Sequence, residues 1–161
     1  MHRTPPPPVI SSARVLAYAF VDDISYQKWG ALYSGDVLIE AVPCLAICAN
    51  LGKDIGPLLF HCDEKWTALG TSGAPSVGET KSHAERNYPG ASARWVDLHT
   101  TVEDALRYYD SVSDTPRCTF CGRRPFEVSG LVEGERAAIC RECVEDFYRG
   151  FNDEPDSSES S

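Results

Sequence analysis

Two cysteine pairs near the C-terminus decide how the end of this chain folds: Cys118-Thr119-Phe120-Cys121-Gly122 and, further on, Ile139-Cys140-Arg141-Glu142-Cys143. Two residues separate the cysteines within each pair, and eighteen residues separate the two pairs. This spacing is typical of four-thiolate zinc modules. Two thiolates in one tight turn reach the same ion, and a second pair completes the tetrahedron that structural zinc prefers. The sequence therefore predicts one structural Zn²⁺ per chain, bound by Cys118, Cys121, Cys140 and Cys143.

The residues around these cysteines predict the element order of a treble-clef finger, which is knuckle, hairpin and helix. Residues 126–128 and 131–132 are short β-like runs, and a polar turn follows at 133–136. From Cys140 onward, apolar residues recur at helical spacing. We therefore expect the second pair at a helix N-terminus, where backbone amides and the helix dipole stabilise thiolates. The apolar face of this helix consists of Val144, Phe147, Tyr148 and Phe151.

Residues 117–151 resemble the zinc-binding domain of the ClpX chaperone family. The family pattern is C-x-F-C-G, then E-V-x-x-L-I/V-x-G, then I-C-x-E-C-V-E. The matching residues are Cys118, Phe120, Cys121, Gly122, Glu127, Val128, Leu131, Val132, Gly134, Ile139, Cys140, Glu142, Cys143, Val144 and Glu145. In that family the module binds zinc, dimerises and recruits adaptors and substrate proteins. It precedes an ATPase there, whereas here it follows another domain, so the resemblance does not imply an unfoldase.

The resemblance implies a finger that binds proteins, and it favours a homodimer formed through the finger. The size of the module supports a binding role, because 35 residues fall below the roughly 40 residues at which a domain needs a metal or a partner to be stable. Its apolar side chains should contact a second copy, another protein or the preceding domain. The candidate contact residues are Phe126, Val128, Leu131, Val144, Phe147 and Phe151.

Length and charge limit the remaining possibilities. The chain has 161 residues, which is enough for one ordinary domain and a small module. Its net charge of −9 makes it a poor candidate for binding phosphate backbones, so we expect no nucleic-acid partner. The sequence shows no signal peptide and no apolar run long enough for a membrane span. Seven cysteines, four of them in a zinc pattern, indicate a cytoplasmic protein.

Residues 14–112 predict a mixed α/β domain of unknown family. Apolar runs predict strands at 14–21, 37–42 and 93–98, a hairpin at 58–62 and 66–70, and helices at 24–33, at 76–88 and from 101 onward. Residues 45–51 fit either a strand or a short helix. The second helix begins with the S-x-x-E capping box of Ser76-Val77-Gly78-Glu79. The flanking segments are a flexible proline-rich lead at 1–13, a linker at 113–116 and an acidic disordered tail at 152–161.

Two further groups of residues in this domain suggest chemistry. Cys44, Cys48, His61 and Cys62 could hold a second metal, but all four lie in apolar runs, where free cysteines usually belong to the core. We therefore expect core packing. His83-Ala84-Glu85, with a later C-x-x-C, is similar to the zinc deaminase signature. Arg117 interrupts that signature before Cys118, and the second cysteine pair explains both sulfurs better, so we expect an ordinary helix surface.

These observations favour a non-catalytic zinc protein whose finger makes protein contacts. The alternative is a small enzyme with its active site in residues 14–112 and with zinc in a structural role only. A deep pocket holding an acid/base pair with shifted pKa values would support the enzyme. An exposed apolar patch on the finger would support the binding protein.

Overall fold

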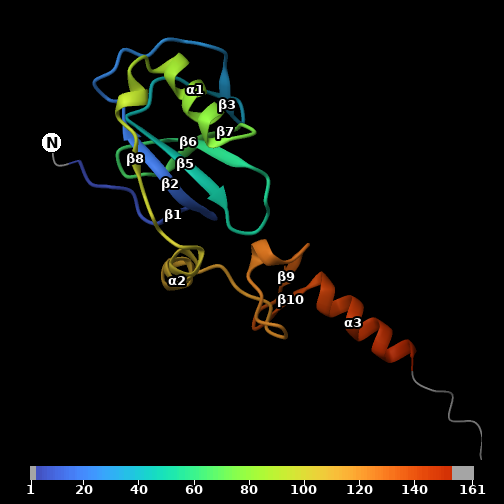
Figure 1. The fold of residues 1–161 in the computed structure, drawn as a ribbon. Coiled ribbons are helices and arrows are strands. Elements are labelled where there is room, and N and C mark those ends of the chain that lie inside the picture. Colours follow the sequence, from blue (N-terminus) through green and yellow to red (C-terminus); the bar gives the residue numbers. More distant parts are fainter. Residues whose placement is uncertain (1–2, 154–161) are drawn as a thin grey trace, which may run out of the picture. The chain divides into compact units, whose positions relative to one another are not determined.

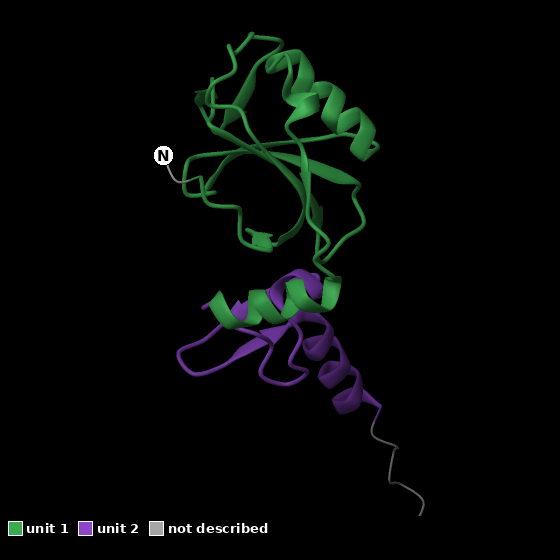
Figure 2. Cartoon of the chain, turned by 60° about the vertical axis from the view of Figure 1, so that its left-hand side comes forward, with its two compact units in different colours: residues 1–112 green, residues 113–161 purple. Residues whose placement is uncertain are grey.

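The computed structural model describes residues 3–153 and divides into two compact units, residues 1–112 and residues 113–161 (Figure 2). The first unit contains most of the strands and two α-helices, and the second contains the zinc-pattern cysteines and one long helix (Figure 1). The predicted combination of a mixed α/β domain and a small C-terminal finger is confirmed. None of the helices within residues 3–153 is long and apolar enough to cross a membrane.

A curled antiparallel sheet forms the body of the first unit (Figure 2). Its strands lie in the order β1-β2-β5-β6-β7, and β8 pairs with β2. A separate hairpin of β3 and β4 contacts β7 through β3. The strands are β1 (Val9–Ile10), β2 (Ala13–Phe20), β3 (Leu32–Ser34), β4 (Val37–Ile39), β5 (Cys44–Asn50), β6 (Pro57–Cys62), β7 (Ala68–Gly73) and β8 (Val96–Asp97). The helices are α1 (Val77–Asn87) and α2 (Val102–Val112), with a 3₁₀ turn at Ala91–Ala93.

The central strand β5 is buried on both faces. Cys44, Ala46 and Cys48 belong to one core cluster, whereas Leu45 and Ile47 belong to a second cluster on the opposite face. A strand of this kind gives a continuous apolar run, which periodicity alone does not distinguish from a short buried helix. The sequence left residues 45–51 open between a strand and a short helix; residues 45–50 belong to the strand β5.

Helix α1 covers one face of the sheet; a local cap begins it, and a long-range hydrogen bond holds its C-terminal end. The Ser76 hydroxyl accepts a hydrogen bond from the backbone N–H of Glu79 at 3.1 Å, so Ser76 caps the N-terminus as the predicted capping box requires of its first residue. At the C-terminus the phenol of Tyr88 accepts a hydrogen bond from the backbone N–H of Val42 at 2.8 Å. Tyr88 is fully buried beside Ala84, so this bond ties the helix to the chain that leads into β5.

The helix predicted at residues 24–33 does not form. The segment is an irregular loop that runs into β3. Its backbone hydrogen bonds go to another element, because the N–H of Gln27 donates to the carbonyl of Asn87 at 2.8 Å. Gly30 adopts a φ of 78°, a left-handed conformation that a regular helix excludes. The strand predicted at residues 93–98 is also mostly absent, since it shortens to Val96–Asp97 after the 3₁₀ turn.

The start of the chain differs from the predicted flexible lead. Val9 and Ile10 are buried and form β1 against β2. The indole N–H of Trp66 donates to the carbonyl of Thr4 at 2.9 Å, and Arg3 forms an ion pair with Asp22 at 2.7 Å. The prolines offer no backbone N–H, but their carbonyls still accept, and that of Pro8 accepts a hydrogen bond from the N–H of Val15 at 2.9 Å. The predicted acidic tail lies mostly outside the described residues, which end at 153.

The three cysteines of the first unit are core residues, as predicted. Cys44, Cys48 and Cys62 are buried free thiols in one apolar cluster, and Cys44 lies opposite Cys62 on the neighbouring strand. Burial raises the pKa of Cys44 to about 11 and that of Cys62 to about 12, so both thiols stay protonated at neutral pH. Across residues 3–153 the four finger cysteines are the only group that gathers as metal ligands.

Glu85 stabilises the turn that follows α1. Its carboxylate accepts hydrogen bonds from the backbone N–H of Gly90 and from both the N–H and the hydroxyl of Ser92, each at 2.7 Å. The bonds from Ser92 and Gly90 lower the pKa of Glu85. This carboxylate therefore has a structural role in the turn that follows α1.

Replacing Glu85 with alanine should lower the melting temperature of the first unit and leave the zinc content unchanged. The expected destabilisation arises because the turn loses three hydrogen bonds. Tryptophan fluorescence during heating would measure the first effect and elemental analysis the second. Glu103→Ala is the matched control, because Glu103 makes only an exposed pair with Arg107 and should have little effect. Loss of zinc from the Glu85→Ala protein would support the deaminase interpretation instead.

Candidate metal centre

The first cysteine pair lies in a tight knuckle. The N–H of Gly122 donates to the carbonyl of Cys118 at 2.8 Å, and the N–H of Cys118 donates to the carbonyl of Arg123 at 3.0 Å. Gly122 has a φ of 74°, so the turn requires the left-handed conformation that glycine adopts without strain. This backbone brings the sulfurs of Cys118 and Cys121 to the same side of the turn.

The second pair lies at the junction of a strand and a helix. Strand β10 (Ala138–Cys140) leads directly into helix α3 (Arg141–Asn152), and Cys140 is the N-cap residue of α3. The sulfur of Cys140 accepts a hydrogen bond from the backbone N–H of Cys143 at 3.4 Å. The N–H of Cys140 in turn donates to the sulfur of Cys118 at 3.4 Å. The N–H of Cys143 favours the thiolate form of Cys140, but burial and the neighbouring sulfurs outweigh it, and the pKa values of Cys140 and Cys143 are both raised.

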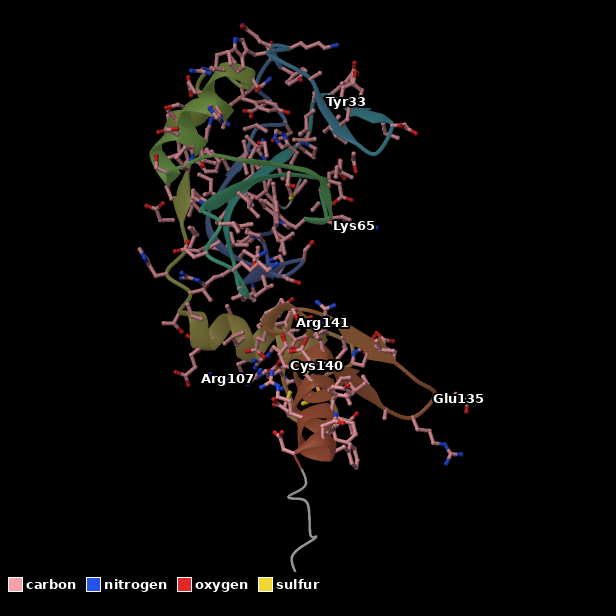
Figure 3. The ribbon with its side chains drawn as sticks, turned by 90° about the vertical axis from the view of Figure 1, so that its right-hand side faces the viewer. Tyr33, Lys65, Arg107, Glu135, Cys140 and Arg141 are labelled. Carbon is pink, nitrogen blue, oxygen red and sulfur yellow. The ribbon has the colours of Figure 1, made fainter. Side chains whose placement is uncertain are left out.

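The four sulfur atoms form one compact cluster, in which Figure 3 labels Cys140. All four lie within 4.8 Å of one another. The sulfurs of Cys118 and Cys143 are 3.7 Å apart, as are those of Cys121 and Cys140. Tetrahedral coordination with Zn–S bonds of about 2.3 Å separates the ligand sulfurs by about 3.8 Å. The cluster therefore has the size and donor type of a four-thiolate zinc site.

The protonation of the cluster explains why it requires a cation. Burial raises the pKa of Cys118, but backbone N–H groups, first that of Cys121, outweigh it and lower the value to about 6. Burial and the neighbouring sulfurs raise the pKa of Cys143. Cys118 therefore loses its proton readily. Cys143 keeps its proton unless a metal ion compensates the negative charge of the cluster. Zinc deprotonates the thiols that coordinate it, and four protein ligands leave no open position for a substrate.

Residues 116–152 match the family model of the ClpX C4-type zinc finger. The match contains the whole cysteine cluster, so the second unit includes a ClpX-type zinc-binding domain. One structural Zn²⁺ fits the four cysteines, as predicted. No solved structure matches the chain.

The hairpin of the ClpX-type finger differs from the predicted one. Residues 126–128 are not a strand, because Pro125 begins a 3₁₀ turn (Pro125–Glu127) in which the N–H of Arg124 donates to the Glu127 carboxylate at 2.7 Å. The hairpin is made by β9 (Leu131–Glu133) and β10, joined across the polar turn by the N–H of Gly134 and the carbonyl of Ala137 at 2.7 Å. Proline has no N–H to donate to a neighbouring strand, and its fixed φ suits the first position of a helical turn. Pro125 therefore starts a 3₁₀ turn where the sequence predicted a strand.

Two residues that position the zinc ligands were not assigned a role from the sequence. Thr119 exchanges hydrogen bonds with Ala138: its N–H donates to the carbonyl at 2.8 Å, and its hydroxyl accepts from the N–H at 3.0 Å. The Glu142 carboxylate accepts a hydrogen bond from the N–H of Ser129 at 2.8 Å, and this bond is the main reason that its pKa falls to about 2. Thr119 thus joins the knuckle to β10, and Glu142 joins α3 to the hairpin. Glu142 belongs to the ClpX pattern, whereas nothing in the sequence singled out Thr119.

Proposed function

We propose that the ClpX-type finger is a protein-binding module that self-associates through the apolar face of α3. This surface, the α3 face, consists of Val144, Phe147, Tyr148 and Phe151 together with Phe120 of the knuckle. The exposure of these side chains is the observation that carries the proposal. The three remaining candidate contact residues, Phe126, Val128 and Leu131, are half-buried and contribute less surface.

The α3 face leaves large aromatic groups in water. Phe147 is 46% exposed, Tyr148 71% and Phe151 82%, and no residue of α3 is buried. Phe120 and Phe147 are packed edge to face, with ring centroids 5.1 Å apart. An ordered aromatic pair at the surface loses little side-chain entropy on binding and resembles the anchors of protein interfaces.

The rest of α3 supports the same conclusion, because its charges lie away from the α3 face. Arg149 is within 4.0 Å of Glu145 and 3.9 Å of Asp146, and Arg141 is within 4.0 Å of Glu145. The helix is therefore amphipathic, with a solvated polar side and an apolar side that the finger does not cover. Soluble proteins rarely expose a contiguous apolar surface without a partner.

A second copy of the chain is the occupant that the ClpX resemblance favours. One amphipathic helix per copy gives a self-complementary surface, which is the geometry of a two-fold dimer. The other possible occupants are a different protein and the first unit of the same chain.

Sedimentation of a Phe147→Gln and Phe151→Gln double variant tests the proposal. The wild-type chain should sediment as a dimer at tens of micromolar, and the variant should sediment as a monomer that still binds one zinc. Glutamine favours the helix, so the variant changes the surface without disrupting α3. Val132→Gln is the matched control, because Val132 is an exposed apolar residue of β9 outside the α3 face. A monomeric wild-type chain at high micromolar concentration contradicts the dimer.

A further inference from the structure

A cavity of about 180 Å³ lies within the first unit, independent of the zinc finger. Its floor is the sheet, from which Leu59, His61 and Ser72 face it. Helix α1 contributes His83 to one side. The loop before β3 and the β3–β4 hairpin complete the wall. Residues far apart in the sequence thus meet around one partly open cavity.

The loop side of the cavity is fixed to α1. The side-chain amide of Asn87 donates to the carbonyls of Gln27 at 3.1 Å and Trp29 at 3.3 Å. The guanidinium of Arg86 lies over the Trp29 ring, 4.3 Å from its centroid. Tyr26 packs against the buried ring of Tyr88, with centroids 5.3 Å apart. The aromatic wall of the cavity is therefore held in place before any ligand binds.

The hairpin side lies close to the sheet because of a glycine. Gly70 is the cross-strand neighbour of His61. A Cβ atom at position 70 would lie 3.2 Å from the Cγ1 of Ile39 and 3.3 Å from the Cδ2 of Leu32. The missing side chain thus lets the hairpin close directly over the sheet beside His61.

Among the described residues that line this cavity, His61 is the one polar side chain that is buried. Its side chain is only 9% exposed, and within residues 3–153 neither ring nitrogen has a hydrogen-bond partner. Burial lowers the pKa of His61 to about 4, so at neutral pH the ring offers one N–H donor and one nitrogen acceptor. Neither ring nitrogen is sealed off from the cavity, so water or the edge of a bound molecule can pair with it there.

We propose that this cavity binds an uncharged heteroaromatic ring, of about nucleobase size, whose edge carries both a hydrogen-bond donor and an acceptor. A cavity of about 150 Å³ accommodates a benzene ring, so the volume suits one small planar molecule. Tyr26 and Trp29 supply aromatic surface for its faces, and His61 and Ser72 supply groups for its edge. Glu40 also lines the cavity, whereas none of the described lining residues is lysine or arginine, which disfavours an anion.

Titration of the ¹⁵N-labelled full chain with adenine, nicotinamide, toluene and benzoate tests the proposal by NMR. Adenine or nicotinamide should shift the amide signals around the cavity with a Kd at or below about 1 mM. Toluene lacks the hydrogen-bonding edge and benzoate carries a negative charge, so both should bind at least about tenfold more weakly. Equal or tighter binding of toluene or benzoate overturns the proposal, and so does the absence of binding by all four probes.

Variants locate the binding and exclude adventitious contacts. His61→Phe keeps a ring of similar shape and removes both polar atoms, so the better probe should bind about tenfold more weakly. Ser72→Ala removes one hydroxyl and should weaken the affinity for the better probe by about threefold. This variant serves as the test if His61→Phe does not fold. Thr71→Ala is the matched control, because the neighbouring strand residue faces the other side of the sheet. An unchanged affinity in every folded cavity variant overturns the proposal.

Discussion

Replacing Cys140 with alanine should unfold the finger and leave the first unit folded. Cys140 ends β10, caps α3 and supplies one of the four sulfurs, so its loss removes the metal, the hairpin contact and the helix start together. Structural zinc contributes on the order of 10–16 kcal/mol to the folding of such modules. Zinc per chain should fall from one to none, and the circular dichroism of α3 should disappear.

The two units are readily distinguished in this experiment. All three tryptophans, Trp29, Trp66 and Trp95, lie in the first unit, so their fluorescence reports on that unit alone. Cys48→Ala is the matched control, because Cys48 is a buried core thiol of the first unit and should leave one zinc bound. A Cys140→Ala protein that retains its zinc would contradict the ligand assignment, and one that also loses its native tryptophan emission would contradict the independence of the two units.

Tyr88→Ala should destabilise the first unit by about 3–5 kcal/mol, the range for removing a large buried aromatic side chain. The side chain is fully buried between α1 and the sheet, and its phenol accepts the hydrogen bond from the N–H of Val42. Tyr88→Phe should cost about 1–3 kcal/mol, because it leaves that N–H buried without a partner. Urea unfolding followed by tryptophan fluorescence would measure both. Tyr33→Ala, at an exposed tyrosine of the same unit (Figure 3), should stay within about 0.5 kcal/mol.

The same tyrosine makes the first unit sensitive to alkali. Burial raises the pKa of Tyr88 from 10.0 to about 12, so the folded state keeps a proton that the unfolded state loses. The resulting contribution to stability is complete below about pH 10 and is lost as the pH rises towards 12. Tyr88→Phe should flatten this alkaline decline. A decline as steep in the variant as in the wild type would assign it to other groups.

The sequence predicted correctly the features that are determined by residues close together in the chain or bound to one ion. The spacing of the cysteine pairs gave the metal ligands, the capping box at Ser76 gave the start of α1, and alternating runs gave the β6–β7 hairpin. Each of these features depends on residues that are near one another in sequence or that share one ion. Turn geometry and coordination chemistry restrict such groups strongly.

The features that the sequence missed depend on contacts between distant segments. The loop at residues 24–33 takes its backbone partner from Asn87, so no local pattern marks it as irregular. The cavity brings together His61 and His83 with residues of the loop before β3, and no spacing relates them. At the finger the error was local: Pro125 was available as a signal against a strand, but β-like residues after it outweighed the proline.

The four sulfurs of the finger differ in how well the protein shields them. Cys118 and Cys140 are buried and their sulfurs accept backbone N–H bonds, and Cys143 is half-buried at the base of α3. Cys121 is the exposed ligand, at the tip of the knuckle. We therefore expect a chelator or an oxidant to attack at Cys121 before the three better-shielded cysteines. The rate of zinc loss should then depend mainly on access to Cys121, whereas the affinity for zinc depends on all four ligands.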